Sequence, residues 1–209
     1  MLYIPDNPLN VQIGSEKEVK YLAGQICRLV EASRGHTLVL FTSYALMGAV
    51  YNQVKDRLPF PLLEVWRHSS DMIHKFKHSN NAVLFAAGSC WEGVDFPGDM
   101  VSSLIIVRLP FSVPNPLSEA EREQYPSLQD YIRAVIIPDM QVKLRQGFGR
   151  AIRTETDTCV ISILDHRAAP GERYHQAVLE ALPNLRITRK IKEVEEFIRA
   201  KKSSDYFLS

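Results

Sequence analysis

The stretch that decides the fold is Thr37-Leu38-Val39-Leu40-Phe41, a run of apolar and β-branched residues without polar alternation. Comparable runs predict further strands at residues 62–65, 82–86, 103–107 and 158–164. Continuous apolar runs are typical of strands that are covered on both faces, as in a parallel sheet. The chain is therefore expected to form an α/β fold built on a mostly parallel sheet.

Between these runs, apolar residues recur at helical spacing. One helix is expected from about Val19 to Val30, and Gly35 is placed to end it, because glycine readily follows a helix C-terminus. Other helices are expected at about 44–58, after Ser69 or Ser70, at 118–137 and at 138–153. Strands and helices that alternate in this way predict a doubly wound sheet with helices on both faces.

The loops at the carboxyl ends of parallel strands are where such folds bind ligands. Ser43, residues 88–95 and residues 165–167 each follow a predicted strand and are the candidate functional loops. A proline-rich excursion occupies residues 109–127. The charged tail from about Lys190 is expected to be a loosely packed terminal helix.

Composition limits the class of protein. With 209 residues, of which 45% are hydrophobic and 23% charged, the chain fits one compact domain of a soluble protein. The net charge of +1 gives no general sign of a nucleic-acid partner, so any such surface must be local. No apolar run approaches the ~20 residues of a membrane span, and Cys27, Cys90 and Cys159 lack the spacing of a zinc, disulfide or iron–sulfur site. We expect a cytoplasmic protein with no membrane partner.

The most informative motif is Gln146-Gly147-Phe148-Gly149-Arg150-Ala151-Ile152-Arg153. On the predicted helix, Arg150 and Arg153 follow Gln146 by four and seven positions and share one face with it. A planar guanidinium suits phosphate oxygens better than the point charge of a lysine. Taken alone, however, two such arginines are more often a solvated face or partners of carboxylates. Ile152 stands where a dinucleotide fingerprint requires its third glycine, which excludes that class.

Two elements of an ATP-binding domain are missing from the sequence. No glycine is followed by lysine, so there is no phosphate-binding P-loop. No Asp-Glu pair is present to serve as a Walker B element. The chain alone is therefore expected not to hydrolyse ATP.

Three segments resemble motifs of superfamily 2 helicases, in the branch that contains DinG-like and XPD-like proteins. Residues 40–44 are similar to motif IV, residues 88–99 to motif V and residues 146–153 to motif VI. Residues 91–98 and 108–111 favour the DinG-like group, although Cys90 replaces the aromatic residue usual there.

This resemblance implies a RecA-like fold of the P-loop NTPase type, with residues 1–209 as the second of two motor domains. The first domain, which carries the Walker A and Walker B elements, is absent from the chain. ATP and Mg²⁺ would be shared with that domain, and an iron–sulfur cluster could belong only to it. The whole protein would be a monomeric, ATP-dependent DNA helicase of 5′-to-3′ polarity that binds single-stranded DNA. The alternative class is a stand-alone nucleic-acid- or protein-binding module on a RecA-like scaffold without ATPase activity.

The resemblance also implies roles for individual residues. Motif VI makes Gln146, Arg150 and Arg153 the catalytic residues. Gln146 would orient water or a γ-phosphate oxygen, and the arginines would stabilise the transferring charge. Gly93 and Asp95 of motif V would bind ATP together with these three side chains.

On the nucleic-acid side, the resemblance implies that Ser43, Tyr44, Trp91 and Glu92 contact single-stranded DNA. Trp91 could stack on a base, but an aromatic residue beside an apolar strand is more often part of the packing. Ser43 could equally serve as the N-cap of the following helix. Both alternatives stay open at the level of sequence.

Overall fold

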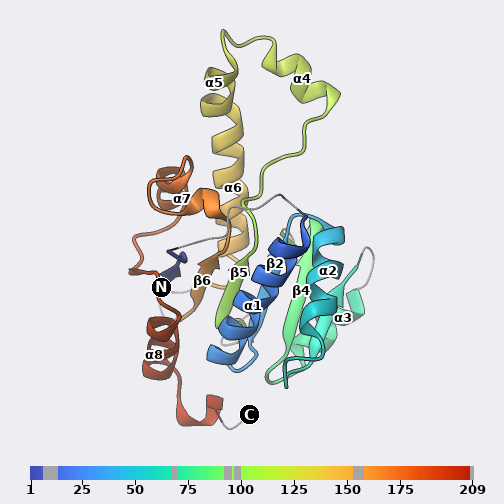
Figure 1. Cartoon of the computed structure of the whole chain (residues 1–209), viewed down its shortest axis with the longest axis vertical. Helices are drawn as coiled ribbons and strands as arrows, with labels where there is room; N and C mark the ends of the chain where they lie inside the picture. Colours follow the sequence, from blue (N-terminus) through green and yellow to red (C-terminus); the bar gives the residue numbers. More distant parts are fainter. Residues whose placement is uncertain (7–13, 67–69, 92–95, 97–99, 153–157, 208–209) are drawn as a thin grey trace.

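A parallel sheet forms the centre of the molecule in the computed structural model, which describes residues 1–6, 14–66, 70–91, 96, 100–152 and 158–207 (Figure 1). Within these residues the sheet has seven strands in the order β3-β4-β2-β5-β6-β1-β7, and all their pairings are parallel. The strands are β1 (Leu2–Tyr3), β2 (Thr37–Phe41), β3 (Leu62–Val65), β4 (Val83–Ala87), β5 (Ser103–Ile106), β6 (Val160–Ile163) and β7 (Ile187–Thr188). The five strands predicted from apolar runs are confirmed. No strand was predicted at β1 or β7, because each has only two residues and therefore shows no periodicity.

Helices cover both faces of this sheet (Figure 1). Neighbouring residues of a strand point to opposite faces, so the central strands contribute to two separate apolar cores. One core packs against α1 (Glu16–Ala32), α2 (Tyr44–Val54) and α8 (Ile191–Lys201). The other packs against α3 (Ser70–Lys77), α6 (Ile137–Phe148) and α7 (His175–Ala181). The doubly wound α/β prediction is confirmed.

Helix α1 ends as the sequence suggests. Its last residue is Ala32, and Gly35 follows with φ of +83°, a left-handed conformation that favours glycine. The Gly35 N–H donates to the carbonyl oxygen of Val30. A Cβ atom at position 35 would lie 1.9 Å from the carbonyl oxygen of Asn81. Both the backbone angle and the close approach therefore require glycine here.

The proline-rich excursion projects from the carboxyl side of the sheet (Figure 1). It contains α4 (Pro116–Arg122) and α5 (Leu128–Tyr131), and a π-helical turn (Ile132–Ile136) leads from α5 into α6. The predicted helix over 118–137 is thus interrupted, whereas α6 begins at Ile137, one residue before the predicted start at Pro138. A proline ring clashes with the carbonyl group four residues earlier in an α-helix. The wider π turn, in which Ile137 N–H donates to Ile132, accommodates Pro138 without a break.

The C-terminal tail is packed, contrary to the expectation of a loose helix. Val194 and Ile198 of α8 are fully buried against the core. Beyond α8, the Tyr206 hydroxyl donates to the carbonyl oxygen of Ser33 at 2.6 Å, and its ring stacks on His36 with centroids 4.3 Å apart. The charged residues near Lys190 form only the outer face of an amphipathic helix, which is why composition suggested weaker packing.

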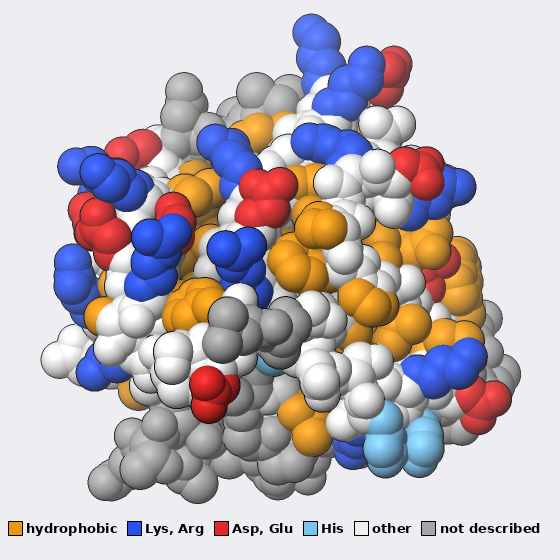
Figure 2. All heavy atoms as spheres, turned by 90° about the horizontal axis from the view of Figure 1, so that it is seen from below, with side chains coloured by type: hydrophobic (Ala, Val, Ile, Leu, Met, Phe, Trp, Pro, Cys, Tyr) orange, Lys and Arg blue, Asp and Glu red, His pale blue; other side chains and the backbone are white. Residues whose placement is uncertain are grey.

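Charges of both signs lie side by side on the face seen from below (Figure 2). This agrees with the net charge of +1 and gives no broad basic patch on that face. None of the helices in the described ranges is both long and apolar enough to span a membrane.

Candidate nucleotide and nucleic-acid site

Trp91 connects three segments that are far apart in the sequence. It ends the short 3-10 helix η1 (Gly88–Trp91), which follows β4, and its side chain is only 8% exposed. The indole N–H donates to the carbonyl oxygen of Phe41, the last residue of β2, at 2.9 Å. A Cβ atom at Gly147 in α6 would lie 3.0 Å from the Trp91 ring, closer than ordinary packing allows. Glycine at position 147 therefore lets α6 pack directly against the indole.

These contacts resolve the two roles considered for Trp91. Its ring is buried between β2 and α6, and its only polar side-chain atom already donates a hydrogen bond. A base could reach the ring only by displacing this packing. The structure therefore supports the packing alternative for Trp91.

Arg150 lies beyond the end of α6, not on its surface. The helix ends at Phe148, and Gly149 and Arg150 form a tighter turn in which Arg150 N–H donates to the carbonyl oxygen of Gly147. The helix predicted to reach residue 153 therefore ends before Arg150, while Arg153 lies outside the described residues. Two glycines weaken the last helical turn, and this turn redirects the chain.

The turn brings the Arg150 side chain to the loop after β4. Its Nε–H donates to the carbonyl oxygen of Trp91 at 3.4 Å, and the side chain is partly buried. The segments predicted as motifs V and VI are thus in direct contact. The Trp91 carbonyl group therefore helps to orient the Arg150 guanidinium.

Gln146 lies in the last turn of α6, next to Gly147. Its side-chain oxygen is buried and has no hydrogen-bond partner among the described residues. A buried acceptor without a donor costs about 1–3 kcal/mol, so a donor from outside this part of the chain would be favourable. Four further predicted site residues, Glu92, Gly93, Asp95 and Arg153, lie outside the described residues.

Ser43 and Tyr44 lie at the carboxyl end of β2. Ser43 is exposed and caps α2: its hydroxyl oxygen accepts from Leu46 N–H at 3.2 Å, which confirms the capping role. The Tyr44 hydroxyl donates to the carbonyl oxygen of Ala87 at 3.4 Å. Capping uses one acceptor site of Ser43 and leaves the residue accessible from solvent.

The sequence analysis missed Trp66, which directly follows β3. Its side chain is 46% exposed, and its ring is stacked on Tyr44 with centroids 5.7 Å apart and an interplanar angle of 17°. The rule that placed Ser43 and residues 88–95 at the sheet's carboxyl edge applies equally to Trp66. That position was the signal that could have identified it.

Asp165 is a structural residue in the third candidate loop. Its carboxylate, 5% exposed, accepts from Leu109 N–H at 2.9 Å and from the Arg167 guanidinium at 2.7 Å. Burial alone would raise the pKa of Asp165, but the hydrogen bonds and charge of Arg167 and the two backbone N–H groups outweigh it and hold the pKa below its usual range. These bonds connect the end of β6 to the start of the excursion and occupy the carboxylate.

We expect Asp165→Asn to lower the free energy of unfolding by roughly 2–3 kcal/mol at neutral pH, because charge-assisted hydrogen bonds are lost. Since the folded pKa of Asp165 is depressed, its contribution is present above the unfolded pKa of about 3.9 and is lost as pH falls through the folded value. The difference between wild type and variant should therefore shrink in acid. Urea unfolding of both proteins at neutral pH and at about pH 3 measures this.

The matched control is Asp6→Asn, which breaks the exposed Asp6–Arg189 ion pair. Exposed pairs contribute about 0–1 kcal/mol. Equal losses for the two variants, or a constant difference across pH, would contradict the role assigned to Asp165.

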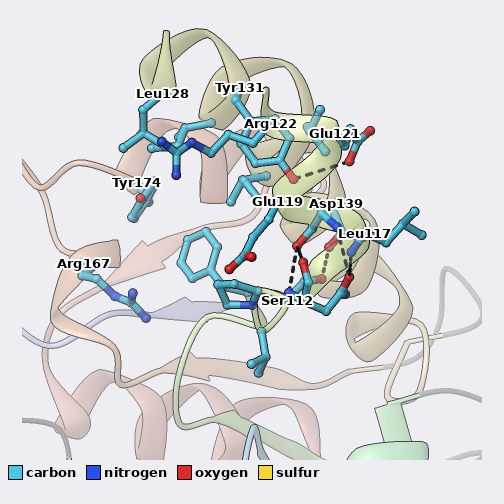
Figure 3. A pocket seen from close by; sticks show the side chains of 18 residues that line it. Ser112, Leu117, Glu119, Glu121, Arg122, Leu128, Tyr131, Asp139, Arg167 and Tyr174 are labelled. Carbon is cyan, nitrogen blue, oxygen red and sulfur yellow. Dashed lines mark hydrogen bonds between the residues drawn. The ribbon is translucent and has the colours of Figure 1, made fainter. Parts of the chain in front are cut away.

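A cavity lies elsewhere, between the excursion and the loop after β6. It has a volume of about 710 Å³ and shares no lining residue with the Trp91 and Arg150 contacts. Glu119, Glu121 and Asp139 line it together with Arg122 and Arg167 (Figure 3). Its three carboxylates outnumber its two arginines, which is unfavourable for a triphosphate.

The parallel sheet with helices on both faces defines a RecA-like α/β domain as the class of protein. The family described as "Helicase C-terminal domain" matches residues 26–185. The chain belongs to this family, and within superfamily 2 it is a DinG-like helicase C-terminal domain.

Named relatives support this assignment. The chain is 37% identical to the ATP-dependent DNA helicase YoaA of Haemophilus influenzae, over 83% of this chain and 27% of that protein. It is 34% identical to YoaA of Escherichia coli, over 91% of this chain and 30% of that protein. The chain thus spans less than a third of the length of these relatives.

Solved structures confirm the RecA-like fold. An XPD helicase structure matches with a TM-score of 0.69 and 23% identity, covering 90% of this chain and 35% of that one. The C-terminal domain of the DEAD-box protein Dbp5 matches with a TM-score of 0.58 and 14% identity, covering 96% of each chain.

Proposed function

We propose that this chain is the second motor domain of an ATP-dependent DNA helicase and that Arg150 acts on ATP held by a separate P-loop domain. One observation carries the proposal: the Trp91 carbonyl group holds the Arg150 side chain at the carboxyl edge of the sheet. The similarity to helicases named YoaA supports it. The missing P-loop and Asp-Glu pair require the other half of the ATP site to come from elsewhere.

The side chains of Arg150 and Gln146 are better suited to contact the γ-phosphate of ATP than to coordinate Mg²⁺. The planar guanidinium of Arg150 suits phosphate oxygens. The side-chain oxygen of Gln146, which has no hydrogen-bond partner among the described residues, could accept a hydrogen bond from a water molecule. Gly93, Asp95 and Arg153 are proposed to complete this half of the site. Among the described residues no cluster of His, Cys, Asp or Glu could hold a metal ion. By resemblance to DinG-like helicases, Mg²⁺ is proposed to be shared with the P-loop domain, and an iron–sulfur cluster would belong only to that part.

The chemistry of this half-site is electrostatic. As the phosphoryl group transfers, negative charge spreads over its oxygens, and a positioned arginine stabilises that charge more than it stabilises bound ATP. Magnesium would neutralise phosphate charge from the other domain. Arg150 can act without reorganisation because the Trp91 carbonyl group already fixes its Nε.

Single-stranded DNA is proposed to run along the carboxyl edge of the sheet near Ser43 and Tyr44, with Glu92 contributing from the loop after η1. Unwinding with 5′-to-3′ polarity, action as a monomer and a place in the cytoplasm rest on the resemblance to DinG-like helicases. Ser43 supports the track because it is exposed at the N-terminus of α2, where backbone N–H groups attract phosphate.

The competing function is a stand-alone binding module that never meets a P-loop domain. It predicts that Arg150 has no effect on any ATPase reaction. The two functions separate in a protein that contains a P-loop domain, and the isolated chain provides the baseline.

The isolated 209-residue chain is expected to fold and to release no phosphate from ATP, with or without single-stranded DNA, because nothing in its sequence can hold MgATP. Phosphate release and circular dichroism on the same sample test this. DNA-stimulated turnover that Arg150→Ala abolishes would refute it. The control is Arg145→Ala, an exposed arginine in the last turn of α6, which should leave such turnover intact.

A further inference from the structure

An exposed tryptophan lies at the edge of the sheet where the DNA track is proposed. Trp66 follows β3, and 46% of its side chain is exposed to solvent. The chain has two tryptophans, and the other, Trp91, is buried. Covering the exposed part of this ring with a flat ligand would remove apolar surface from water and so favour binding.

Trp66 is also held in place. Its ring is stacked on Tyr44 at an interplanar angle of 17°, and its edge lies over α2, where a Cβ atom at Gly48 would be 3.5 Å away. The indole N–H donates to the Glu64 carboxylate at 3.4 Å. The ring therefore loses little conformational entropy when a flat ligand stacks on it.

The surroundings of the pair suit a phosphate next to the stacked ring. Tyr44 is the first residue of α2, an 11-residue helix, so the aromatic pair adjoins the positive end of its dipole. The first turn of α2 contains no acidic residue that would compete for this position. Each nucleotide of a single-stranded nucleic acid supplies such a pair of groups, a flat base and an anionic phosphate.

We propose that Trp66, supported by Tyr44, is a stacking platform for one unpaired base of single-stranded DNA, whose adjacent phosphate faces the N-terminus of α2. This rests on the proposed DNA-binding function and assigns to Trp66 the stacking role that the burial of Trp91 removes. Because every base has a π face, the platform accepts all four bases.

The test uses the 209-residue chain with a labelled oligothymidylate and with a strand of equal length that carries abasic sites. Stacking on an aromatic residue makes a large enough contribution that Trp66→Ala should weaken binding of the normal strand at least about fivefold. The abasic strand keeps its phosphates, so it should bind wild type and Trp66→Ala equally. Trp66→Phe should retain part of the affinity. Ile187→Ala, a half-exposed apolar residue of β7 at the opposite edge of the sheet, should bind both strands as wild type does.

Tryptophan fluorescence gives a second readout. Single-stranded DNA should quench the emission of wild type and of Trp91→Phe, but not that of Trp66→Phe, in which only the buried Trp91 remains. If wild type binds DNA while Trp66→Ala binds both strands unchanged, the platform is refuted and the DNA-binding function stands. The platform is equally refuted if Trp66→Ala loses affinity for both strands to the same extent. If wild type binds no single strand even at low salt, the proposed DNA track fails together with the platform.

Discussion

Replacing Arg150 by alanine in the full-length enzyme is expected to lower kcat by roughly 10³–10⁵-fold, the usual contribution of an arginine finger. The affinity for ATP should change far less, because the guanidinium meets charge that develops mainly in the transition state. Lysine should rescue poorly, since it lacks the planar set of donors that lets Arg150 bond to Trp91 and to a phosphate oxygen at once. Steady-state turnover, nucleotide affinity and melting temperature are measured on the same preparations.

The matched control is Arg145→Ala in the last turn of α6, where the side chain is exposed. We expect near-normal turnover from it. Arg153→Ala should behave like Arg150→Ala if both arginines of motif VI reach the nucleotide. Early melting with normal turnover of the folded fraction would make Arg150 a purely structural residue and would remove the proposed catalytic site.

The second large effect is expected at Trp91. Trp91→Ala should lower the free energy of unfolding by about 3–5 kcal/mol, because it opens a cavity between β2 and α6. It also leaves the buried carbonyl oxygen of Phe41 without its donor. Trp66→Ala, at a half-exposed position, should cost much less. Denaturant unfolding of the two variants measures the contrast, and similar losses would contradict the burial assigned to Trp91.

A double-mutant cycle with Gly147 tests the contact itself. Gly147→Ala places a methyl group 3.0 Å from the Trp91 ring and should destabilise the protein. Trp91→Phe removes the ring atoms nearest to that methyl group, so the double variant should be more stable than the sum of the single losses predicts. Strictly additive losses would show that the two positions are not in contact.

In the intact enzyme, the Trp91 variants should also lower kcat, because the Trp91 backbone orients Arg150. The carbonyl oxygen that accepts from Arg150 is retained in every variant, so any loss must come from displacement of η1. A kcat that follows only the folded fraction would assign Trp91 to stability alone.

The local sequence was enough to predict the central strands and to predict that both of their faces are buried. The run from Thr37 to Phe41 carries that information by itself, because an apolar residue at every position can be satisfied only when both faces are covered. The order of the three motifs along the sequence was also enough to indicate the helicase family, without any information on contacts. The N-cap at Ser43 and the stop at Gly35 follow from backbone chemistry within a few residues.

Tertiary structure alone decided which tryptophan is buried. Trp66 and Trp91 each follow a predicted strand, and nothing within a few residues distinguishes them. Whether each ring is buried depends on residues distant in sequence: the Trp91 ring packs against Gly147, and the Trp66 ring stacks on Tyr44.

The same reason explains the error at Arg150. Helical spacing assumed that α6 continues to residue 153, whereas the helix ends at Phe148 and Arg150 turns to the carbonyl group of Trp91. Periodicity along one segment reports which face of that segment is apolar. Periodicity does not indicate which distant backbone group will form a hydrogen bond with a side chain. That contact forms only when the folded sheet brings the loops after β2 and β4 next to the end of α6.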